Sequence, residues 1–345
     1  MTIAIILGTR PEIMKNYAII RALRETSVSH LVLHTNQHQD ELMQHAHFEL
    51  VGYQPDFVLA PPYSMGKAID WVCRCIRQYN ITTIVVNGDT AAALAGATAA
   101  LYTDTPLAHV EAGLRSFDST MIEERNRIMV DAVAHFLFTY TEYHAEYLHQ
   151  NRELRGHIVN TGNTTVDLLA DFAPYLINPH LGRYIYLTLH RKEFTDNPVR
   201  MEETFRTLNE LAPLFDQIIF PMHPRTRECM HRYDISPSTT SRITVIEPVP
   251  FIQSFAYVKH AAVVVTDSGC IQEEAYLLGT PCVTLRENTE RPETLASGAN
   301  VVSGFMPDKI WGAVRQQAAK GHTIFPPIYG TVGVGHRIVD VLVGV

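Results

Sequence analysis

The sequence predicts an α/β protein made of two doubly wound domains, each built on a parallel sheet, with a cleft between them. Two observations support this fold class. Short apolar segments alternate with helical segments in the first half of the chain, and the same pattern starts again in the second half. Continuously apolar strands separated by helices are typical of parallel sheets that are covered on both faces. The length of 345 residues also fits about two domains.

The first half of the chain opens with the apolar strand Ile3–Leu7, which ends at Gly8. Pro11 then suits the first turn of a helix, because its missing N–H would have no partner there. An alanine-rich helix is expected over Asp89–Tyr102. The other strands expected in this half are His30–Thr35, Thr83–Val86, Leu107–Val110 and Phe136–Tyr140.

The composition changes between Gly162 and Arg183, where asparagine, proline and glycine accumulate, and the domain boundary is expected there. We assign residues 1–170 to the first domain and 171–345 to the second, with the last helix packing back on the first. Five strands and three helices are expected beyond the boundary. The strands are Tyr184–Leu189, Gln217–Met222, Ile243–Ile246, Ala262–Thr266 and Cys282–Leu285, and the helices are Val199–Leu211, Pro250–His260 and Ile271–Leu278.

Composition excludes several classes of protein. With 46% apolar and 19% charged residues, the chain is not largely disordered, and no apolar run approaches the ~18–20 residues of a membrane span. The N-terminus does not resemble a signal peptide, so we expect a cytoplasmic protein without a membrane partner. A net charge of −8 argues against a broad nucleic-acid surface. Five scattered cysteines without a C-x-x-C motif are expected to be reduced thiols, and no metal site is expected.

Polar residues follow most of the expected strands, and open α/β sheets bind ligands at the carboxyl ends of their strands. In the first half these residues include carboxylates, and in the second half they include cations and a Ser-Gly pair. Ordinary surface polarity accounts for only part of this pattern. The segments are Gly8–Arg10, Asn87–Asp89 and His109–Glu111 in the first half, and His190–Glu193, His223–Arg225, Asp267–Gly269 and Arg286–Glu287 in the second.

The segment Asp267–Glu274 is the strongest candidate for binding an anion. Ser268 and Gly269 open a helix directly after an apolar strand, so their backbone N–H groups would face a phosphate. Glu274 lies about one turn into that helix, where a carboxylate could reach a sugar diol. The alternative is a serine N-cap followed by glutamates that favour helix. The sequence has no G-x-G-x-x-G and no Walker A motif, which argues against classical dinucleotide and P-loop sites.

Three carboxylates of the first half, Asp89, Glu111 and Glu123, are candidates for acid/base chemistry. Each has a structural alternative: Asp89 could cap a helix, and Glu123 or its neighbour Glu124 could pair with an arginine on a solvated helix face. Glu111 is harder to explain structurally, because it ends an apolar strand. Carboxylates gathered in a cleft raise the pKa values of one another, which suits proton transfer near neutral pH.

Taken together, nine motifs resemble the non-hydrolysing UDP-N-acetylglucosamine 2-epimerases. They occur in order over almost the whole chain, and HVEAGLRS, DSG-x-IQEEA and TERPE are specific in combination. The motifs are Gly8–Lys15, Asn87–Thr90, His109–Ser116, Glu123–Arg127, Gly162-Asn163, Leu187–Glu193, Pro221–Thr226, Thr266–Ala275 and Arg286–Glu293.

This resemblance implies two Rossmann-like domains of the glycosyltransferase-B type that bind a UDP-sugar, act as a homodimer and need no cofactor. It implies interconversion of UDP-GlcNAc and UDP-ManNAc, through elimination of UDP to 2-acetamidoglucal and its re-addition. The implied catalytic residues are Asp89, Glu111, Glu123, His190 and Lys15. The implied substrate and UDP contacts are Arg10, Ser268, Gly269, Cys270, Glu274, Arg191, Phe251 and Arg291.

The chain departs from the family pattern at a few positions. Cys270 replaces a glycine, and Phe194 replaces an asparagine. The segment Asn36–Asp40 resembles the allosteric substrate site of bacterial members, but two of its usual residues are changed. Four alternatives therefore stay open: an epimerase of a related UDP-2-acetamido sugar, a hydrolysing epimerase, a UDP-sugar glycosyltransferase, or a module that only binds UDP-sugars. The Thr-Arg-Pro-Glu at Thr9–Glu12 argues against the hydrolysing enzyme.

Overall fold

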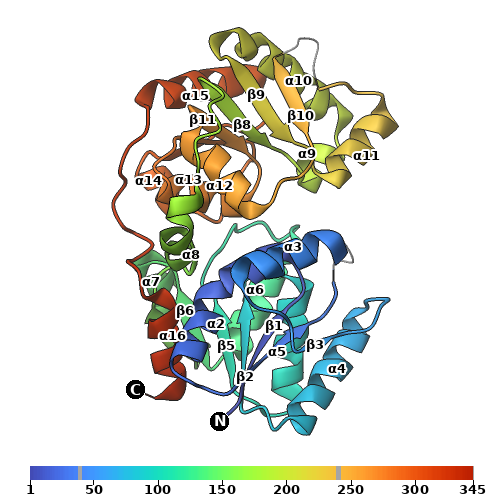
Figure 1. Cartoon of the computed structure of the whole chain (residues 1–345), viewed down its shortest axis with the longest axis vertical. Coiled ribbons are helices and arrows are strands. Elements are labelled where there is room, and N and C mark those ends of the chain that lie inside the picture. Colours follow the sequence, from blue (N-terminus) through green and yellow to red (C-terminus); the bar gives the residue numbers. More distant parts are fainter. Residues whose placement is uncertain (38–40, 238–241, 345) are drawn as a thin grey trace. The chain divides into compact units, whose positions relative to one another are not determined.

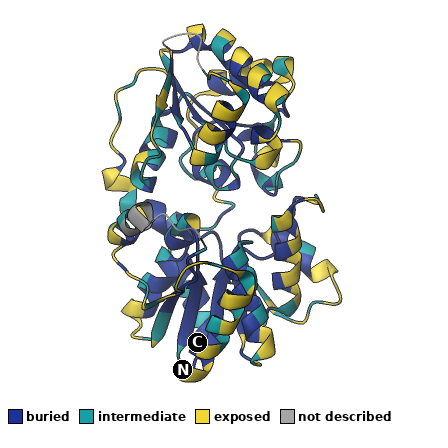
Figure 2. Cartoon of the chain, turned by 90° about the vertical axis from the view of Figure 1, so that its right-hand side faces the viewer, coloured by how far each residue is buried: buried dark blue, intermediate teal, exposed yellow. Residues whose placement is uncertain are grey.

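The computed structural model describes residues 1–37, 41–237 and 242–344, and the chain forms two compact units (Figure 1). Unit 1 contains Met1–Asp171 and Pro327–Val345, and unit 2 contains Phe172–Pro326. Each unit is a parallel β-sheet with helices packed on it, which confirms the predicted fold class. Figure 2 shows the strands as buried and the outer faces of the helices as exposed.

Unit 1 is built on a seven-stranded sheet with the order β3-β2-β1-β4-β5-β6-β7, and all of its strand pairs are parallel. The strands are β1 (Ile3–Leu7), β2 (His30–His34), β3 (Phe57–Val58), β4 (Thr83–Asn87), β5 (Leu107–Val110), β6 (Phe136–Thr139) and β7 (His157–Asn160). The helices are α1 (Arg10–Lys15), α2 (Tyr17–Glu25), α3 (Glu41–Val51), α4 (Met65–Gln78), α5 (Ala91–Tyr102), α6 (Ile122–Val133), α7 (Glu142–Gln150), α8 (Thr165–Phe172) and α16 (Val334–Val343).

The sheet of unit 1 is buried on both faces, as the continuous apolar strands predict. Every residue of β1 is buried. Successive side chains of a strand point to opposite faces, and Ala4 and Ile6 pack in a cluster that includes Val72 of α4 and Ala93 of α5. The apolar side chains on both faces of β1 therefore require helices on both sides of the sheet.

The C-terminal segment of the chain completes unit 1. Helix α16, red in Figure 1, packs against α2. The buried carboxylate of Asp167 on α8 fixes the start of α16 by accepting hydrogen bonds from the N–H groups of Gly333 (2.7 Å), Val334 (3.2 Å) and Gly335 (2.9 Å). These contacts tie residues 327–344 to elements that precede residue 172.

Unit 2 repeats the architecture with a six-stranded parallel sheet in the order β10-β9-β8-β11-β12-β13. Its strands are β8 (Tyr184–Thr188), β9 (Gln217–Pro221), β10 (Ile243–Ile246), β11 (Val263–Thr266), β12 (Cys282–Thr284) and β13 (Asn300–Val302). Its helices are α9 (Lys192–Thr195), α10 (Pro198–Leu211), α11 (Pro224–Tyr233), α12 (Phe251–His260), α13 (Gly269–Leu277), α14 (Pro292–Ala296) and α15 (Pro307–Lys320), with single 3-10 turns at Ala173–Tyr175 and Ala212–Leu214.

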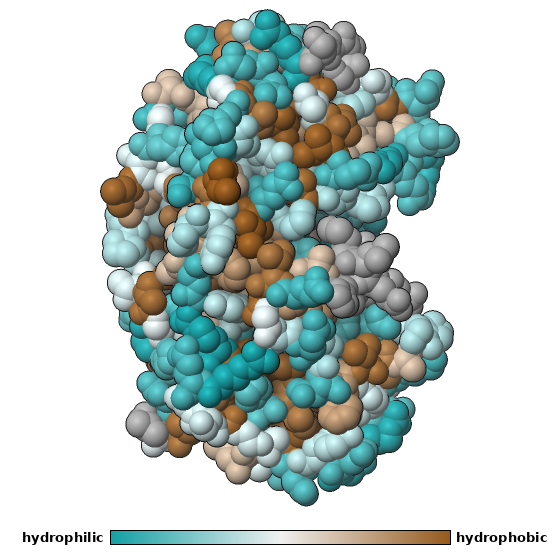
Figure 3. Space-filling view, viewed as in Figure 1, coloured by the Kyte–Doolittle hydropathy of each residue, from teal (hydrophilic) through white to brown (hydrophobic). Residues whose placement is uncertain are grey.

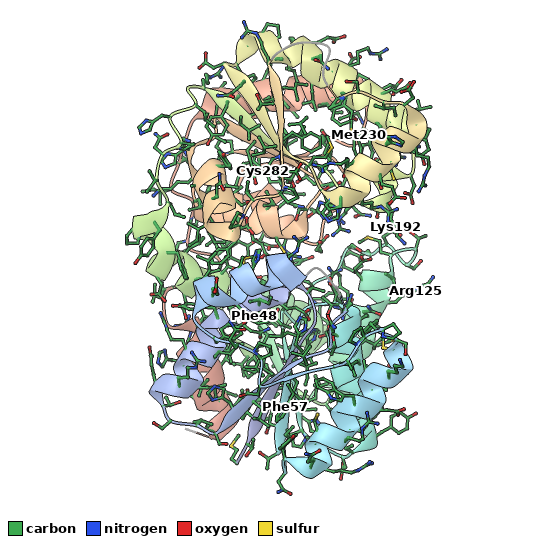
Figure 4. All side chains as sticks on the ribbon, turned by 45° about the vertical axis from the view of Figure 1, so that its right-hand side comes forward. Phe48, Phe57, Arg125, Lys192, Met230 and Cys282 are labelled. Atoms are coloured by element: carbon green, nitrogen blue, oxygen red, sulfur yellow. The ribbon has the colours of Figure 1, made fainter. Side chains whose placement is uncertain are left out.

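Unit 2 has its own core. Met230 of α11 and Cys282 of β12 lie within its packed interior (Figure 4). Phe194, which departs from the family motif, is fully buried and stacks on Phe305. The aromatic side chain at this position therefore serves packing beneath the loop that follows β8.

The surface is mixed in character. Figure 3 shows apolar side chains interspersed among hydrophilic ones on the face in view. Across the described part of the chain, no helix is both long enough and apolar enough to cross a membrane.

Candidate active site

The predicted site residues of unit 1 lie at the carboxyl edge of its sheet, around the point where the strand order reverses. In the order β2-β1-β4-β5, the chain runs outward in both directions from the neighbours β1 and β4. Gly8–Arg10 follow β1, Asn87–Asp89 end β4, and Glu111 follows β5. Open α/β sheets bind ligands outside the carboxyl ends of their strands at such a switch point.

Glu111 is held in a buried ion pair with Lys15. The two side chains meet at 2.5 Å, and the Tyr140 hydroxyl donates to the same carboxylate oxygen at 3.3 Å. The Lys15 ammonium also lies 5.8 Å from the centre of the Tyr140 ring. Glu111 adopts a φ of +74°, a costly conformation for a residue with a side chain. Such backbone strain is concentrated at functional sites, so the structure supports a functional interpretation of Glu111.

A glycine lets Glu111 approach the loop that follows β4. Gly88 has a φ of +71°, and a Cβ built on it would lie only 3.1 Å from the Glu111 carboxylate. The Glu111 side chain therefore lies beside the Gly88-Asp89 peptide. This contact brings the Glu111 carboxylate to the loop that carries Asp89.

Asp89 is not the helix cap that one alternative suggested. The cap of α5 is Thr90, whose hydroxyl accepts a hydrogen bond from the Ala93 N–H at 3.0 Å. The Asp89 carboxylate instead forms an ion pair with Arg127 of α6, and its carbonyl accepts a hydrogen bond from Asn126 at 2.8 Å. Helix α6 is thus joined directly to the Asp89 loop.

Glu123 and Glu124 have different roles. Glu124 is buried, accepts from the Ser116 N–H (2.8 Å) and lies 3.3 Å from Arg127. Glu123 is half-buried and has no hydrogen bond or ion pair among the described side chains. It lies one helical turn before Arg127, on the face of α6 that meets Asp89. Arg125 points away from unit 1 (Figure 4) and donates to the Ser119 carbonyl, so it does not neutralise Glu123 either.

The loop after β1 is organised by Glu12. One carboxylate oxygen accepts from the N–H groups of Gly8 (3.0 Å) and Thr9 (2.8 Å), and the other accepts from the Thr90 hydroxyl (2.7 Å). Arg10 begins α1 and forms no ion pair among the described residues. Glu12 therefore joins the loop that carries Arg10 to the loop that carries Asp89. No pattern in the sequence predicted this role of Glu12.

Glu12 should make the stability of the protein depend on pH. Burial raises the pKa of Glu12 to about 7, although its hydrogen bonds favour the ionised form. The folded state therefore favours protonated Glu12. The free energy of unfolding is not reduced by Glu12 below pH 4.5, and it decreases as the pH rises from 4.5 toward 7. Relative to wild type, Glu12→Gln should gain up to about 3 kcal/mol in free energy of unfolding between those limits. Urea titrations across this range measure the difference, and parallel pH profiles would contradict it.

In unit 2, His190 follows β8 and Asp267 follows β11, the two neighbours at the switch point of the second sheet. His190 Nδ1 lies 3.2 Å from Asp267 Oδ1, so the side chain faces a carboxylate. Asp267 also accepts from the N–H groups of His190 (2.7 Å) and Arg191 (2.8 Å). Burial opposes ionisation of Asp267, but His190 and these donors lower its pKa. Asp267 therefore orients His190.

The start of α13 matches the predicted anion site in position. Ser268 is the N-cap residue, but its hydroxyl makes no capping hydrogen bond, contrary to the structural alternative. Gly269 begins the helix, and Cys270 is half-buried next to it. Glu274 is buried in the second turn. A half-buried hydroxyl thus lies beside the backbone N–H groups of a helix N-terminus, a site suited to phosphate.

Arginines and carboxylates pack tightly beside this helix start. Glu290 lies 2.7 Å from Arg286 and 3.4 Å from Arg191, while buried Arg291 pairs with Glu273. A Cβ on Gly269 would lie 2.4 Å from the Glu290 carboxylate, so this position requires glycine. The cluster fixes Arg191 and holds Arg291 away from solvent.

Two predicted contacts differ from the rest in environment. The Phe251 ring is buried against Phe172 and Phe255, at 5.4 and 5.6 Å between ring centres. Its role in binding UDP stays a prediction, as does that of Arg291. The segment Asn36–Asp40 lies partly outside the described residues, at positions 38–40. Among the described residues, no three side chains of His, Cys, Asp or Glu are grouped to hold a metal ion.

These features define a class of protein: two Rossmann-like α/β units, one with carboxylates and a lysine at its switch point, the other with a histidine and a helix N-terminus. The sequence matches the family described as UDP-N-acetylglucosamine 2-epimerase over residues 21–343. The chain belongs to this family. It is an epimerase, an enzyme of the isomerase class, with a glycosyltransferase-B type of fold.

Individual relatives agree with the family assignment. The UDP-N-acetylglucosamine 2-epimerase of Methanocaldococcus jannaschii is 36% identical over 99% of both chains. A crystal structure of M. jannaschii UDP-GlcNAc 2-epimerase in complex with UDP-GlcNAc and UDP has a TM-score of 0.93, with all of both chains covered. The UDP-2,3-diacetamido-2,3-dideoxy-D-glucuronate 2-epimerase of Pseudomonas aeruginosa is 34% identical over 99% of both chains.

Proposed function

We propose that the protein interconverts UDP-GlcNAc and UDP-ManNAc without hydrolysing the sugar nucleotide. The observation that carries the proposal is the pairing of Glu111 with Lys15 beside the Asp89 loop, inside the matched family motifs. An inversion at C2 needs proton transfer on both faces of that carbon, and therefore at least two acid/base groups. Asp89, Glu111 and Glu123 supply them.

The C2 proton is a poor acid, because C2 carries an acetamide nitrogen and no carbonyl. Departure of UDP makes its removal easier. As a carboxylate removes the proton, the C–H electrons form the C1=C2 double bond and the C1–O bond to UDP breaks, giving 2-acetamidoglucal and UDP. A proton delivered to the other face of C2, with a UDP oxygen returning to C1, gives the epimer. No water is consumed.

In this proposal unit 2 binds UDP and unit 1 supplies the acid/base groups. Ser268, Gly269 and Cys270 contact phosphate, and Glu274 contacts the ribose diol. His190 and Arg10 stabilise the negative charge that develops on the leaving UDP. Arg191, Phe251 and Arg291 stay UDP contacts predicted by resemblance, and of these Phe251 and Arg291 are buried.

Incubation with UDP-GlcNAc in deuterated water, followed by NMR of the products, tests the function. The expected result is deuterium at C2 in UDP-GlcNAc and UDP-ManNAc, with the sugar nucleotide intact. Free ManNAc with UDP would indicate the hydrolysing enzyme. UDP-GlcNAc that is unchanged and free of deuterium would contradict the proposal.

A second substrate is supported by the relative from P. aeruginosa, which is named for a diacetamido glucuronate sugar. The elimination chemistry at C1 and C2 would be the same for that sugar. The ratio of kcat/KM values for the two UDP-sugars decides between them, and a ratio in favour of the diacetamido sugar would replace UDP-GlcNAc as the proposed substrate.

Glu274→Ala should weaken UDP binding and leave the melting temperature within a few degrees of wild type. The reason is that a ribose contact acts on the ligand, whereas a helix-stabilising glutamate acts on the fold. Calorimetric titration with UDP and thermal unfolding measure the two effects. Glu202→Ala, on the exposed face of α10, serves as the control. A lower melting temperature with unchanged affinity would favour the structural alternative.

Cytoplasmic location, the homodimer and the absence of nucleic-acid and membrane partners stay predictions from the sequence.

A further inference from the structure

A buried cluster of charged side chains contacts the loops that carry Asp89 and Glu111. Its members are His109 on β5, Asp131 on α6 and Arg115, at 0%, 1% and 8% exposure. His109 Nδ1 lies 2.6 Å from Asp131 Oδ1, and Arg115 donates to Asp131 Oδ2 at 2.6 Å. Charged groups this deeply buried are costly unless each one is paired, so their placement needs an explanation.

The hydrogen bonds show which form His109 takes. Its Nε2 lies 2.9 Å from the Gly88 carbonyl, which can only accept, so Nε2 carries a proton. Its Nδ1 faces Asp131. Asp131 also accepts from Arg115 and from the Gly113 N–H, so its carboxylate is an acceptor as well. This geometry calls for a donor at both ring nitrogens of His109, as in an imidazolium.

This cluster forms hydrogen bonds with both loops that carry candidate acid/base residues. The Gly88 carbonyl bound by His109 belongs to the peptide that precedes Asp89. Asp131 accepts from the Gly113 N–H at 3.2 Å, two residues after Glu111. The buried His109–Asp131 pair therefore forms hydrogen bonds with both loops.

Other charged groups of the described residues also lie near these carboxylates, and they include Glu12, whose carboxylate accepts from the Thr90 hydroxyl next to Asp89. Lys15 and the Tyr140 hydroxyl contact Glu111, and Arg127 contacts Asp89 while also pairing with Glu124. The buried cluster itself carries two positive charges, on His109 and Arg115, and one negative charge, on Asp131. The balance is an added positive charge close to both loops.

We propose that His109 and Asp131 are positioning residues of the epimerase: the buried imidazolium holds the Gly88 carbonyl, and with it Asp89, and adds positive charge behind the two carboxylates. This inference rests on the proposed function. His109 does not touch substrate in this proposal, because its ring is fully enclosed.

Three substitutions separate the two contacts of His109. His109→Gln keeps an amide donor near Nε2 for Gly88 and removes the charge. His109→Asn keeps a donor near Nδ1 for Asp131 and loses Gly88. Asp131→Asn removes the anion with little change of shape. We expect kcat to fall about 10–100-fold, the scale of residues that orient ligating groups, with KM within about threefold. His109→Asn should be the slower of the two histidine variants.

Two readouts distinguish positioning from general stabilisation. The acidic limb of kcat/KM should move to higher pH in His109→Gln, because the neutral side chain no longer favours ionised carboxylates. The double variant His109→Gln with Asp131→Asn should cost no more than the worse single variant, because the two residues act as one unit. Asp167→Asn, which removes a buried carboxylate in the same unit, should lower stability and leave kcat and its pH profile unchanged.

Nitrogen-15 NMR of the histidine-labelled full chain tests the charge state without any activity. Both His109 ring nitrogens should be protonated at pH 7, and a neutral ring would overturn the inference. This test uses the unmodified protein, so it stands if a variant fails to fold. An active wild type whose variants keep normal kcat and pH profiles would also overturn it. Failure of the wild type to incorporate deuterium would contradict the proposed function instead.

Discussion

Glu111→Gln should lower kcat for epimerisation at least ~100-fold, the scale of one acid/base group, and leave UDP binding intact. The amide cannot exchange a proton with C2, but it keeps an oxygen to accept from Lys15 and Tyr140, which contact Glu111 now. The loss should appear in kcat and not in KM, because the interaction matters in the transition state. Steady-state kinetics with UDP-GlcNAc, together with calorimetric titration of UDP, measure both quantities.

Controls make this result specific. Glu146→Gln changes an exposed glutamate on α7 of the same unit and should be indistinguishable from wild type. Asp89→Asn should lose activity on the same scale as Glu111→Gln, since Asp89 is the second proposed acid/base group and its loop lies beside Glu111. Circular dichroism verifies that each variant is folded. Near-normal turnover in both folded site variants would show that the acid/base roles are assigned to the wrong residues.

His190→Ala should reduce kcat about 100-fold, which is the usual cost of removing one donor from a developing oxyanion. Asp267 orients the His190 imidazole. The centre of the His223 ring lies 5.2 Å from the centre of the His190 ring. A donor fixed in this way helps the departing UDP more than it helps the bound substrate. The kcat should therefore fall at least as much as KM changes.

The matched variant is His231→Ala, an exposed histidine at the end of α11 in the same unit. It should retain wild-type kinetics. Deuterium exchange at C2, measured on the same samples, shows whether elimination itself is slowed. A His190→Ala enzyme with normal kcat and a raised KM would make His190 a uniform binding contact, and the leaving-group role would be wrong.

The parts of the fold that could be predicted are those with a local signature. Buried parallel strands such as Ile3–Leu7 are apolar throughout, so the sequence marks them. The edge strands β3, Phe57–Val58, β7, His157–Asn160, and β13, Asn300–Val302, were not predicted. They are two to four residues long and only partly buried, so hydrophobicity leaves too short a pattern to recognise.

The same distinction between local and distant features applies to the candidate site. Motif order identified the residues at strand ends, because each motif is continuous in sequence. The partners of those residues were missed: Asp267 lies 77 positions from His190, and Asp131 lies 22 positions from His109. Contacts over such distances are created by the fold, and no local pattern encodes them. For Asp89 the local pattern offered a wrong alternative: its position suggested a helix cap, but Thr90 is the N-cap of α5.

The return of residues 327–344 to unit 1 has a consequence for how the protein is made. Unit 2 is a continuous stretch of chain, Phe172–Pro326, inserted between two segments that form a single core. Because the ribosome delivers the chain from its N-terminus, unit 2 can finish folding while unit 1 still lacks α16 and the N–H partners of Asp167. During that interval the face of α2 that packs on α16 stays open to water. We therefore expect unit 2 to reach its folded state before the core of unit 1 closes, because that core needs residues 327–344.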